Sequence, residues 1–230
     1  ITGFTSTTLV SALVRRNFGA TTAVNEWRLG AWSATTGFPQ TVGFFEQRLC
    51  FAATSAQPQT LWMSQSADFE NHEPDSVPSG GGERIIADDD ALDYTISSEQ
   101  VNVIRWIAAG KNLLLGTLGG EWRVTSNGPL ITPTDIDVKQ ATSFGSANRQ
   151  AVKVRGRVVY LQRARRKLFE FVFDFNVDNF TSYDQTLLAE HVTKGGIGEI
   201  AYQQELDSVL WCVRDDGQIA TLTYQPDQKV

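Results

Sequence analysis

Apolar and polar residues alternate in short runs that recur in four places along the chain, each time in the same order: strand, polar turn, strand, turn, strand. The first run of each copy is short and alternating, the second is almost continuously apolar, and the third has a bulky residue at a matching position. Strand-only units with a period of about 40 to 50 residues are typical of propeller blades. We therefore predict an all-β fold of β-propeller-like repeats, with antiparallel blades and only minor short helices. The four copies are residues 41–65, 103–126, 151–174 and 199–224.

The strands of each repeat can be placed from the same pattern. Because side chains of a propeller pack between neighbouring blades, we expect the second strands and the aromatic residues of the third strands to be buried. The expected first strands are 42–44, 104–106, 152–154 and 200–202, the second are 49–51, 113–115, 158–161 and 209–211, and the bulky third-strand residues are Trp62, Trp122, Phe169 and Ile219.

Two regions follow from this pattern. Residues 1–37 are an N-terminal strand segment leading into the propeller, in which the alternation of residues 27–33 predicts one strand. Residues 38–230 are a propeller-like region of at least four repeats. An insertion at 66–100, rich in Pro, Gly and Asp, separates the first two repeats. Its apolar content is too low to offset the entropy of ordering a separate core, so we expect a surface excursion.

Short helices are expected at two places outside the repeats. A pair of serines begins residues 97–102 and predicts a single helical turn. Residues 187–192 predict a short helix, with Lys194 in its last turn and two glycines at 195–196 ending it. A strand over the same six residues is the alternative.

Composition sets further limits. A hydrophobic content of 41% and a charged content of 20% are ordinary for a folded domain. The net charge of −6 gives no overall attraction to nucleic-acid phosphate. No apolar run reaches the length of about 18 residues that predicts a membrane-spanning helix. The chain starts without methionine and ends in what resembles a turn and the start of a strand, so we expect a piece of a longer polypeptide; a complete protein with processed ends is the alternative.

The two cysteines are Cys50 and Cys212, in the second strands of different repeats. Neither has a CxxC partner or a histidine at metal-ligand spacing. We expect buried, reduced thiols, as in a protein assembled in a reducing cytosol.

Candidate catalytic groups are few, because the chain has two histidines. His72 is expected in a solvated loop. His191, beside Glu190, could belong to a Ser-His-Asp triad, but no GxSxG or other nucleophile motif is present, so a core or cap histidine is expected. We therefore predict no catalytic residues and no enzymatic activity.

Candidate ligand sites are equally weak. Asp88, Asp89, Asp90 and Asp93 could bind calcium, but they lack the alternating spacing of a calcium loop, and a solvated acidic loop is preferred. The glycines at 80–82 are not followed by the lysine of a phosphate-binding loop. Those within 116–120 are expected in a turn that needs positive φ. No metal-binding or cofactor-binding residues and no cofactor are predicted.

The strongest local charge feature is a basic turn formed by Arg163, Arg165, Arg166 and Lys167 in the third repeat. A solvated turn is the simplest interpretation. A contact with a partner protein or with an anion is the alternative.

Several motifs, in order, resemble those of the tail tubular or tail nozzle proteins of short-tailed bacteriophages and prophages. The resemblance covers about residues 27 to 230. It rests on WRLGAWS (27–33), GFP (37–39), FFEQRL (44–49), QPQTLWMS (57–64), DFEN (68–71), QVNVIRW (100–106), GGEW (119–122), LLAEH (187–191) and YQQE (202–205).

The resemblance implies a structural virion protein of the phage tail, assembled in the bacterial cytoplasm, with a β-propeller and no catalytic residues. It implies a hexameric ring for the intact protein, contacts with the upper tail ring and fibres, and DNA ejected through the lumen. The family's longer N-terminal and C-terminal parts are not in this sequence, so their contacts cannot be placed. The net charge predicts that DNA crosses without being gripped.

A ring of this kind needs two different complementary surfaces on each subunit. We expect the 66–100 insertion and the basic turn to be parts of them with opposite charge. A carbohydrate-binding, receptor-binding or glycan-cleaving propeller is one alternative, although the charged residues fall mainly in turns. A protein-interaction propeller of the WD type is another, although no Trp-Asp dipeptide occurs.

Overall fold

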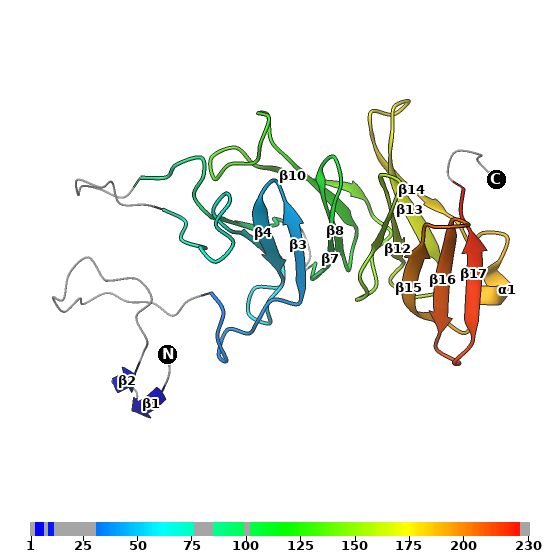
Figure 1. Cartoon of the computed structure of the whole chain (residues 1–230), viewed down its shortest axis with the longest axis horizontal. Helices are drawn as coiled ribbons and strands as arrows, with labels where there is room; N and C mark the ends of the chain where they lie inside the picture. Colours follow the sequence, from blue (N-terminus) through cyan, green and yellow to red (C-terminus); the bar gives the residue numbers. More distant parts are fainter. Residues whose placement is uncertain (1–2, 7–8, 12–30, 76–84, 99–101, 226–230) are drawn as a thin grey trace. The chain divides into compact units, whose positions relative to one another are not determined.

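The computed structural model describes residues 3–6, 9–11, 31–75, 85–98 and 102–225 (Figure 1). The chain divides into two compact units, residues 1–31 and 32–230. In the first unit, β1 (Gly3–Ser6) and β2 (Leu9–Ser11) form an antiparallel pair. The strand predicted at 27–33 lies partly outside the described residues, and its described end is not a strand: Ser33 makes an isolated bridge with Gly37.

The second unit contains four antiparallel sheets, in each of which the strands follow one another in sequence order (Figure 1). Sheet I contains β3 (Thr41–Phe45), β4 (Arg48–Ala52), β5 (Thr60–Met63) and β6 (Leu92–Thr95). Sheet II contains β7 (Ile104–Ala109), β8 (Leu113–Thr117), β9 (Glu121–Thr125) and β10 (Asp137–Thr142). Sheet III contains β11 (Val152–Val154), β12 (Arg157–Leu161), β13 (Leu168–Asp174) and β14 (Asn179–Asp184). Sheet IV contains β15 (Ile197–Gln203), β16 (Val209–Arg214) and β17 (Ile219–Thr223).

The prediction of a nearly all-β chain of antiparallel units is confirmed, and each strand expected within the four repeats is present. The fourth strands β6, β10 and β14 were missed. The prediction that all of 66–100 is a surface excursion is wrong for its last part, because β6 pairs with β5 and buries Leu92. Ile96, just after β6, is also buried. This strand is only four residues long and follows an acidic run, so its pattern is too brief to predict it.

A single short helix, α1 (Glu190–Thr193), occurs among the described residues. It begins three residues later than predicted, because Leu187 and Leu188 lie exposed in a turn before it. Gly196 has a φ of 84° and its N–H donates to the Thr193 carbonyl, so a glycine does end the helix. The helical turn predicted at 97–102 falls partly outside the described residues, and Ser97 and Ser98 are not helical. No helix in the described ranges has the length and apolarity needed to cross a bilayer.

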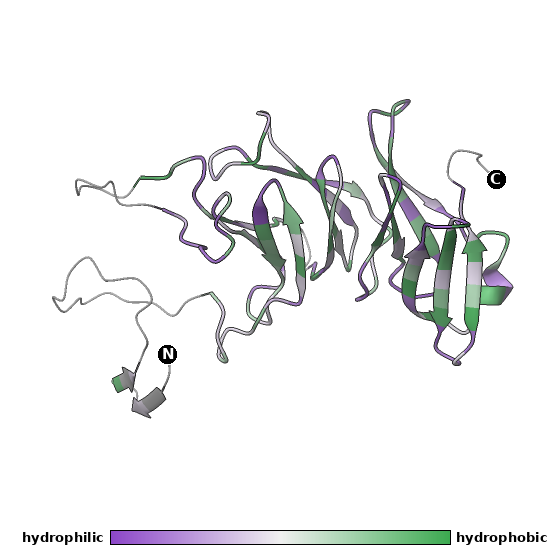
Figure 2. Cartoon of the chain, in the orientation of Figure 1, coloured by the Kyte–Doolittle hydropathy of each residue, from purple (hydrophilic) through white to green (hydrophobic). Residues whose placement is uncertain are grey.

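Alternation along the strands explains how the sheets pack. In β8, Leu113 and Leu115 belong to a cluster shared with sheet I, whereas Leu114 belongs to a cluster shared with sheet III. Because successive side chains of a strand point to opposite faces, sheet II is covered on both faces. The apolar bands on the strands are visible in Figure 2.

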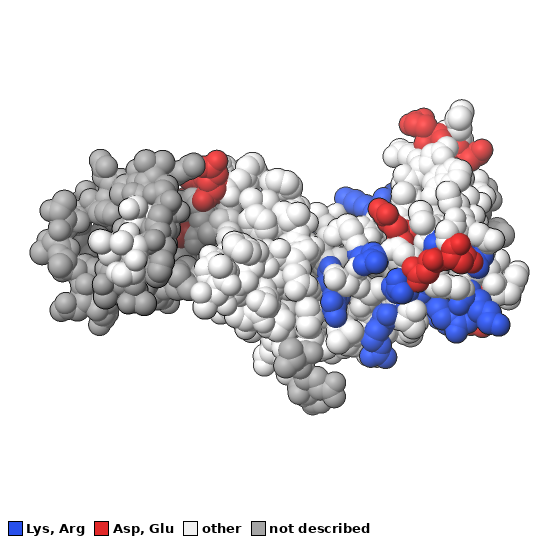
Figure 3. Space-filling view, turned by 90° about the horizontal axis from the view of Figure 1, so that it is seen from below, with Lys and Arg blue, Asp and Glu red and all other residues white. Residues whose placement is uncertain are grey.

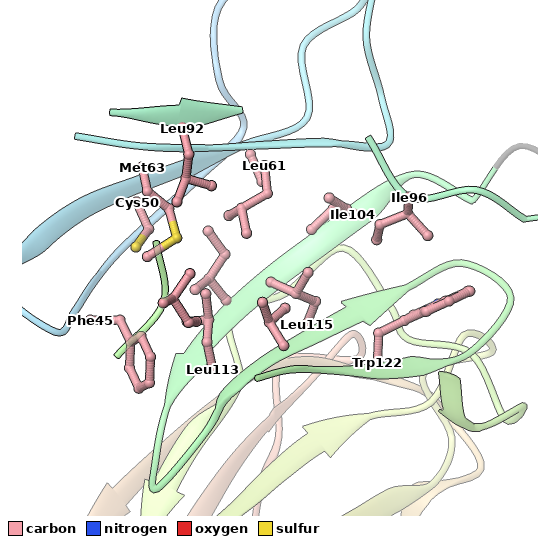
Figure 4. Packing of buried hydrophobic residues seen from close by; sticks show 14 of the residues in the cluster. Phe45, Cys50, Leu61, Met63, Leu92, Ile96, Ile104, Leu113, Leu115 and Trp122 are labelled. Atoms are coloured by element: carbon pink, nitrogen blue, oxygen red, sulfur yellow. The ribbon is translucent and has the colours of Figure 1, made fainter. Parts of the chain in front are cut away.

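Sheet III is covered in the same way. Val158 and Tyr160 of β12 pack toward sheet II, and Val159 and Leu161 pack toward sheet IV. Figure 4 shows the cluster between sheets I and II, in which Cys50, Leu61 and Met63 face residues of β7 and β8. Three apolar clusters thus join the four sheets in sequence order.

The expected burial of the third-strand residues is only partly observed. Trp122 and Phe169 lie in clusters between sheets, as predicted. Trp62 is buried, but it packs edge-on against Trp32 on the opposite face of sheet I. The expected burial of the second strands fails at Trp211, which is 40% exposed on the open face of sheet IV. Ile219, for which no burial was predicted, is 62% exposed on the same face.

The glycines within 116–120 do not have the positive φ predicted for them. Their role is to allow close approach. A Cβ on Gly116 would overlap the indole of Trp106, and one on Gly120 would overlap the side chain of Gln140. Tertiary contacts across sheet II therefore require glycine at these positions.

Candidate functional surfaces

The prediction that His72 lies in a solvated loop is wrong. Its ring centre lies 4.8 Å from that of Trp32 and 5.6 Å from that of Phe51, on the outer face of sheet I. Burial lowers the pKa of His72. Both of its ring nitrogens are buried without a hydrogen-bond partner in the described part of the chain. The imidazole therefore packs among aromatic rings on this face of sheet I.

His191 lies in the last turn of α1 and is exposed, so of the core or cap position expected for it the core is wrong, and a position at the end of the helix is what the structure has. The adjacent Glu190 carboxylate is bound by Lys167 Nζ at 3.1 Å. This contact holds Glu190 in an ion pair between α1 and the basic turn.

The acidic run is solvated except at Asp90, where the prediction is wrong. Asp88, Asp89 and Asp93 are exposed, whereas Asp90 is buried. The Asp90 carboxylate accepts hydrogen bonds from Gln65 Nε2 at 3.0 Å and from the Ala87 N–H at 2.8 Å. Among the described residues, no group of three His, Cys, Asp or Glu side chains is arranged to hold a metal ion.

Arg48 explains why this end of the insertion is ordered against sheet I. Its guanidinium is buried and donates to the carbonyl oxygens of Ser64 at 2.7 Å, Asp90 at 2.6 Å and Asp88 at 2.7 Å. Hydrogen bonds from a charged donor are stronger than neutral ones. Sequence reasoning had no means of finding this residue, because its acceptors are backbone groups about 16 to 42 positions away.

Cys50 and Cys212 are buried and free, as predicted. Burial raises the pKa of the Cys50 thiol to about 12 and that of Cys212 to about 11. Thiols of this kind act as small apolar side chains.

The basic turn connects β12 and β13, and half of it is paired. Arg165 forms a two-bond contact with Asp215, with nitrogen–oxygen distances of 2.9 and 3.1 Å. Lys167 binds Asp184 at 2.8 Å as well as Glu190. Arg163 and Arg166 are exposed. The turn is therefore tied to sheet IV and α1 on one side and remains basic on the other.

Two adjoining hollows lie beside the turn. The first, of about 270 Å³, is lined by Arg105, Arg149, Arg163 and Arg165, among other residues. The second, of about 540 Å³, shares Arg105 and Arg149 with the first and extends to Gln40 and to the first two residues of β3. We call these two hollows together the arginine groove.

The sequence contains a signal for this groove that the net charge conceals. Residues 103–167 carry twelve Lys or Arg against three Asp or Glu, a net charge of +9. Residues 38–102 and 168–230 carry −9 and −8. On the face shown in Figure 3, Lys and Arg side chains gather over the half of the unit that contains sheets III and IV, while sheet I shows almost none.

The two end sheets each keep an open face with apolar residues. On sheet IV, Trp211 is 40% exposed and Val213 is 43% exposed. On sheet I, Val42 and Phe44 are more than half exposed. Exposed aromatic and branched side chains on a sheet face are typical of protein interaction surfaces.

The sequence matches no protein-family model and has no significant match among curated proteins.

Proposed function

We propose that the four sheets are consecutive blades of a β-propeller. Each sheet is an antiparallel meander, and neighbouring sheets pack face to face in sequence order. In two of the three neighbouring pairs the first strands also lie together, β3 against β7 and β11 against β15, whereas sheets II and III are in contact through their fourth strands, β10 and β14. Blades arranged around an axis bring their first strands together in this way.

The protein would be a structural subunit of a bacteriophage tail, a tail nozzle protein of the virion. One observation supports a scaffold most directly: the two end sheets present different apolar faces that nothing in the described chain covers completely. Two different faces suit a heterologous, head-to-tail contact, which closes into a ring when the rotation between subunits divides a full turn. The motif resemblance makes a hexamer the expected ring.

In this role the protein binds copies of itself, the upper tail ring and the fibres, and DNA passes through the lumen. It needs no cofactor and carries out no reaction. Assembly takes place in the bacterial cytoplasm. The acidic blocks on either side of the basic segment would limit DNA binding, because a polyanion passing through meets repulsion over most of the chain.

Light scattering and negative-stain images of the full-length gene product test the proposal. We expect a closed ring, and we expect Trp211→Glu to shift the protein toward monomers because it places a charge on the open face of sheet IV. Asp178→Asn is the control, because Asp178 is exposed in the turn between β13 and β14 of sheet III and lies on neither end sheet. A monomeric full-length protein would exclude the ring.

Two further measurements separate this function from its alternatives. Cleavage of bacterial polysaccharide or sialosides that a single carboxylate substitution abolishes would favour a glycan-cleaving propeller. Tight binding of duplex DNA that weakens steeply with salt would contradict the proposal that DNA passes through the lumen without binding to the protein.

A further inference from the structure

The arginine groove contains more positive charge than its surroundings neutralise. Of its four arginines, only Arg165 forms an ion pair with a carboxylate in the described part of the chain. Arg149 donates from Nε to the Gly198 carbonyl and from Nη1 to the Asn148 carbonyl at 2.7 Å. These bonds position its guanidinium without neutralising it. No Asp or Glu is among the described residues that line either hollow.

Two donors in the groove also lack acceptors. Arg105 Nε and Thr41 Oγ1 are both buried and make no hydrogen bond to any described residue. Both residues line the larger hollow. Because both atoms are closed off from solvent, a ligand in the hollow does not reach them directly, and its attraction comes from the charge of the groove.

We infer that the arginine groove binds a dianionic phosphate group. Arg105, Arg149 and Arg163 supply three guanidinium charges, and the planar guanidinium fork matches the oxygen spacing of phosphate. Asn148, which lines both hollows, supplies an amide that can donate to a further oxygen. A dianion neutralises more of this charge than a single carboxylate does. The inference is independent of the proposed function.

Charge outside the groove favours a small ligand over a polymer. The flanking blocks of −9 and −8 repel a long polyanion, because its charges extend over neighbouring acidic surface. A single phosphate group interacts mainly with the groove itself. A free or terminal phosphate therefore fits better than the diester backbone of a nucleic acid, which has one charge for each group.

Calorimetric titration of the purified chain with inorganic phosphate and pyrophosphate, at low ionic strength, tests the inference. We expect binding of both, with pyrophosphate tighter. Arg163→Gln, at an exposed position, should weaken affinity about tenfold or more, since it removes charge-assisted hydrogen bonds to the phosphate oxygens. Arg105→Gln should act likewise. Lys111→Gln is the matched control, because it removes one positive charge from the exposed turn at the opposite end of β7 and should change affinity less than about twofold.

The pH dependence is a second readout. Arginine stays charged throughout, whereas inorganic phosphate loses its second charge below a pKa of about 7 and a phosphate monoester below about 6. Affinity should therefore fall between pH 7 and pH 5 in the wild type. No binding, or binding that both arginine variants leave unchanged, would overturn the proposal. Two competitors give further outcomes that would overturn it. One is an oligodeoxynucleotide without terminal phosphate, which offers only diester charges, and the other is the acidic peptide of residues 68–75, which offers only carboxylates. The proposal is wrong if either displaces pyrophosphate more effectively than inorganic phosphate does.

Discussion

Gly116 and Trp106 are directly paired across β7 and β8, and the indole ring of Trp106 occupies the space where a Cβ on Gly116 would lie. Trp106 is completely buried in the cluster between sheets II and III. The glycine thus sets how closely the two strands and the indole can pack. One small residue in the sequence accounts for the position of the largest side chain in that cluster.

Gly116→Ala should destabilise the protein by about 1 to 3 kcal/mol, because an added methyl forces the indole or the backbone to move. Gly110→Ala is the control, since its Cβ would meet only the Asn112 carbonyl at an ordinary 3.5 Å. Urea unfolding followed by tryptophan fluorescence measures both. Equal stability of the two variants would contradict the packing described for Trp106.

Arg48→Gln should destabilise the protein by about 3 kcal/mol or more, because it removes three hydrogen bonds from a buried cation and leaves carbonyl groups unpaired. Amide exchange should accelerate in residues 85–98 more than in sheet III. The exposed Arg166→Gln is the control and should change stability by less than about 0.5 kcal/mol. Unchanged exchange in residues 85–98 would show that Arg48 does not hold this segment.

Leu210 and Trp211 are neighbours in β16 that face opposite sides of sheet IV. Leu210 is fully buried, whereas Trp211 is 40% exposed. In the monomeric chain, Leu210→Ala should cost about 2 to 5 kcal/mol, and Trp211→Ala clearly less. Thermal unfolding of the two variants tests the register of β16. If Trp211→Ala were the more destabilising of the two, Trp211 and not Leu210 would face the core.

Glu121 should make stability fall as pH rises. Its carboxyl is completely buried, and burial raises its pKa, although Thr142 and Ser146 donate to it. Because the folded state holds this proton more tightly, the contribution to stability is complete below the unfolded pKa of about 4.3 and is lost as pH rises through the folded pKa. Glu121→Gln should lack this component in urea midpoints measured from pH 4 upward. The exposed Glu199→Gln should keep it, and a parallel pH profile for Glu121→Gln and the wild type would refute the assignment.

The two thiols should be unreactive in the folded protein. Both are buried, and their pKa values of about 12 and about 11 leave little thiolate at neutral pH. An aromatic disulfide reagent should label neither cysteine in buffer and both in denaturant. Rapid labelling in buffer would show that a strand carrying one of them opens.

The sequence alone determined the strand content, the order of the repeats and the burial of both cysteines, because these depend on local alternation of apolar and polar residues. The apolar strands β8 and β12 were the easiest to predict, because neighbouring sheets cover both of their faces and their sequences are therefore almost continuously apolar. The short strand β6 was missed because four residues beside an acidic run give too little pattern.

The tertiary structure decided everything that depends on residues distant in sequence. It placed His72 against Trp32, the carbonyl groups of the insertion on Arg48, and Gly116 under Trp106, and none of these pairs leaves a local pattern. The arginine groove is the same kind of feature. Its residues come from β7, from the connection before β11 and from the turn before β13, and only the packing of the sheets brings their charges together. Hydrophobic periodicity acts over neighbouring residues and is visible in the sequence, whereas hydrogen bonding and charge act through space and depend on the folded chain.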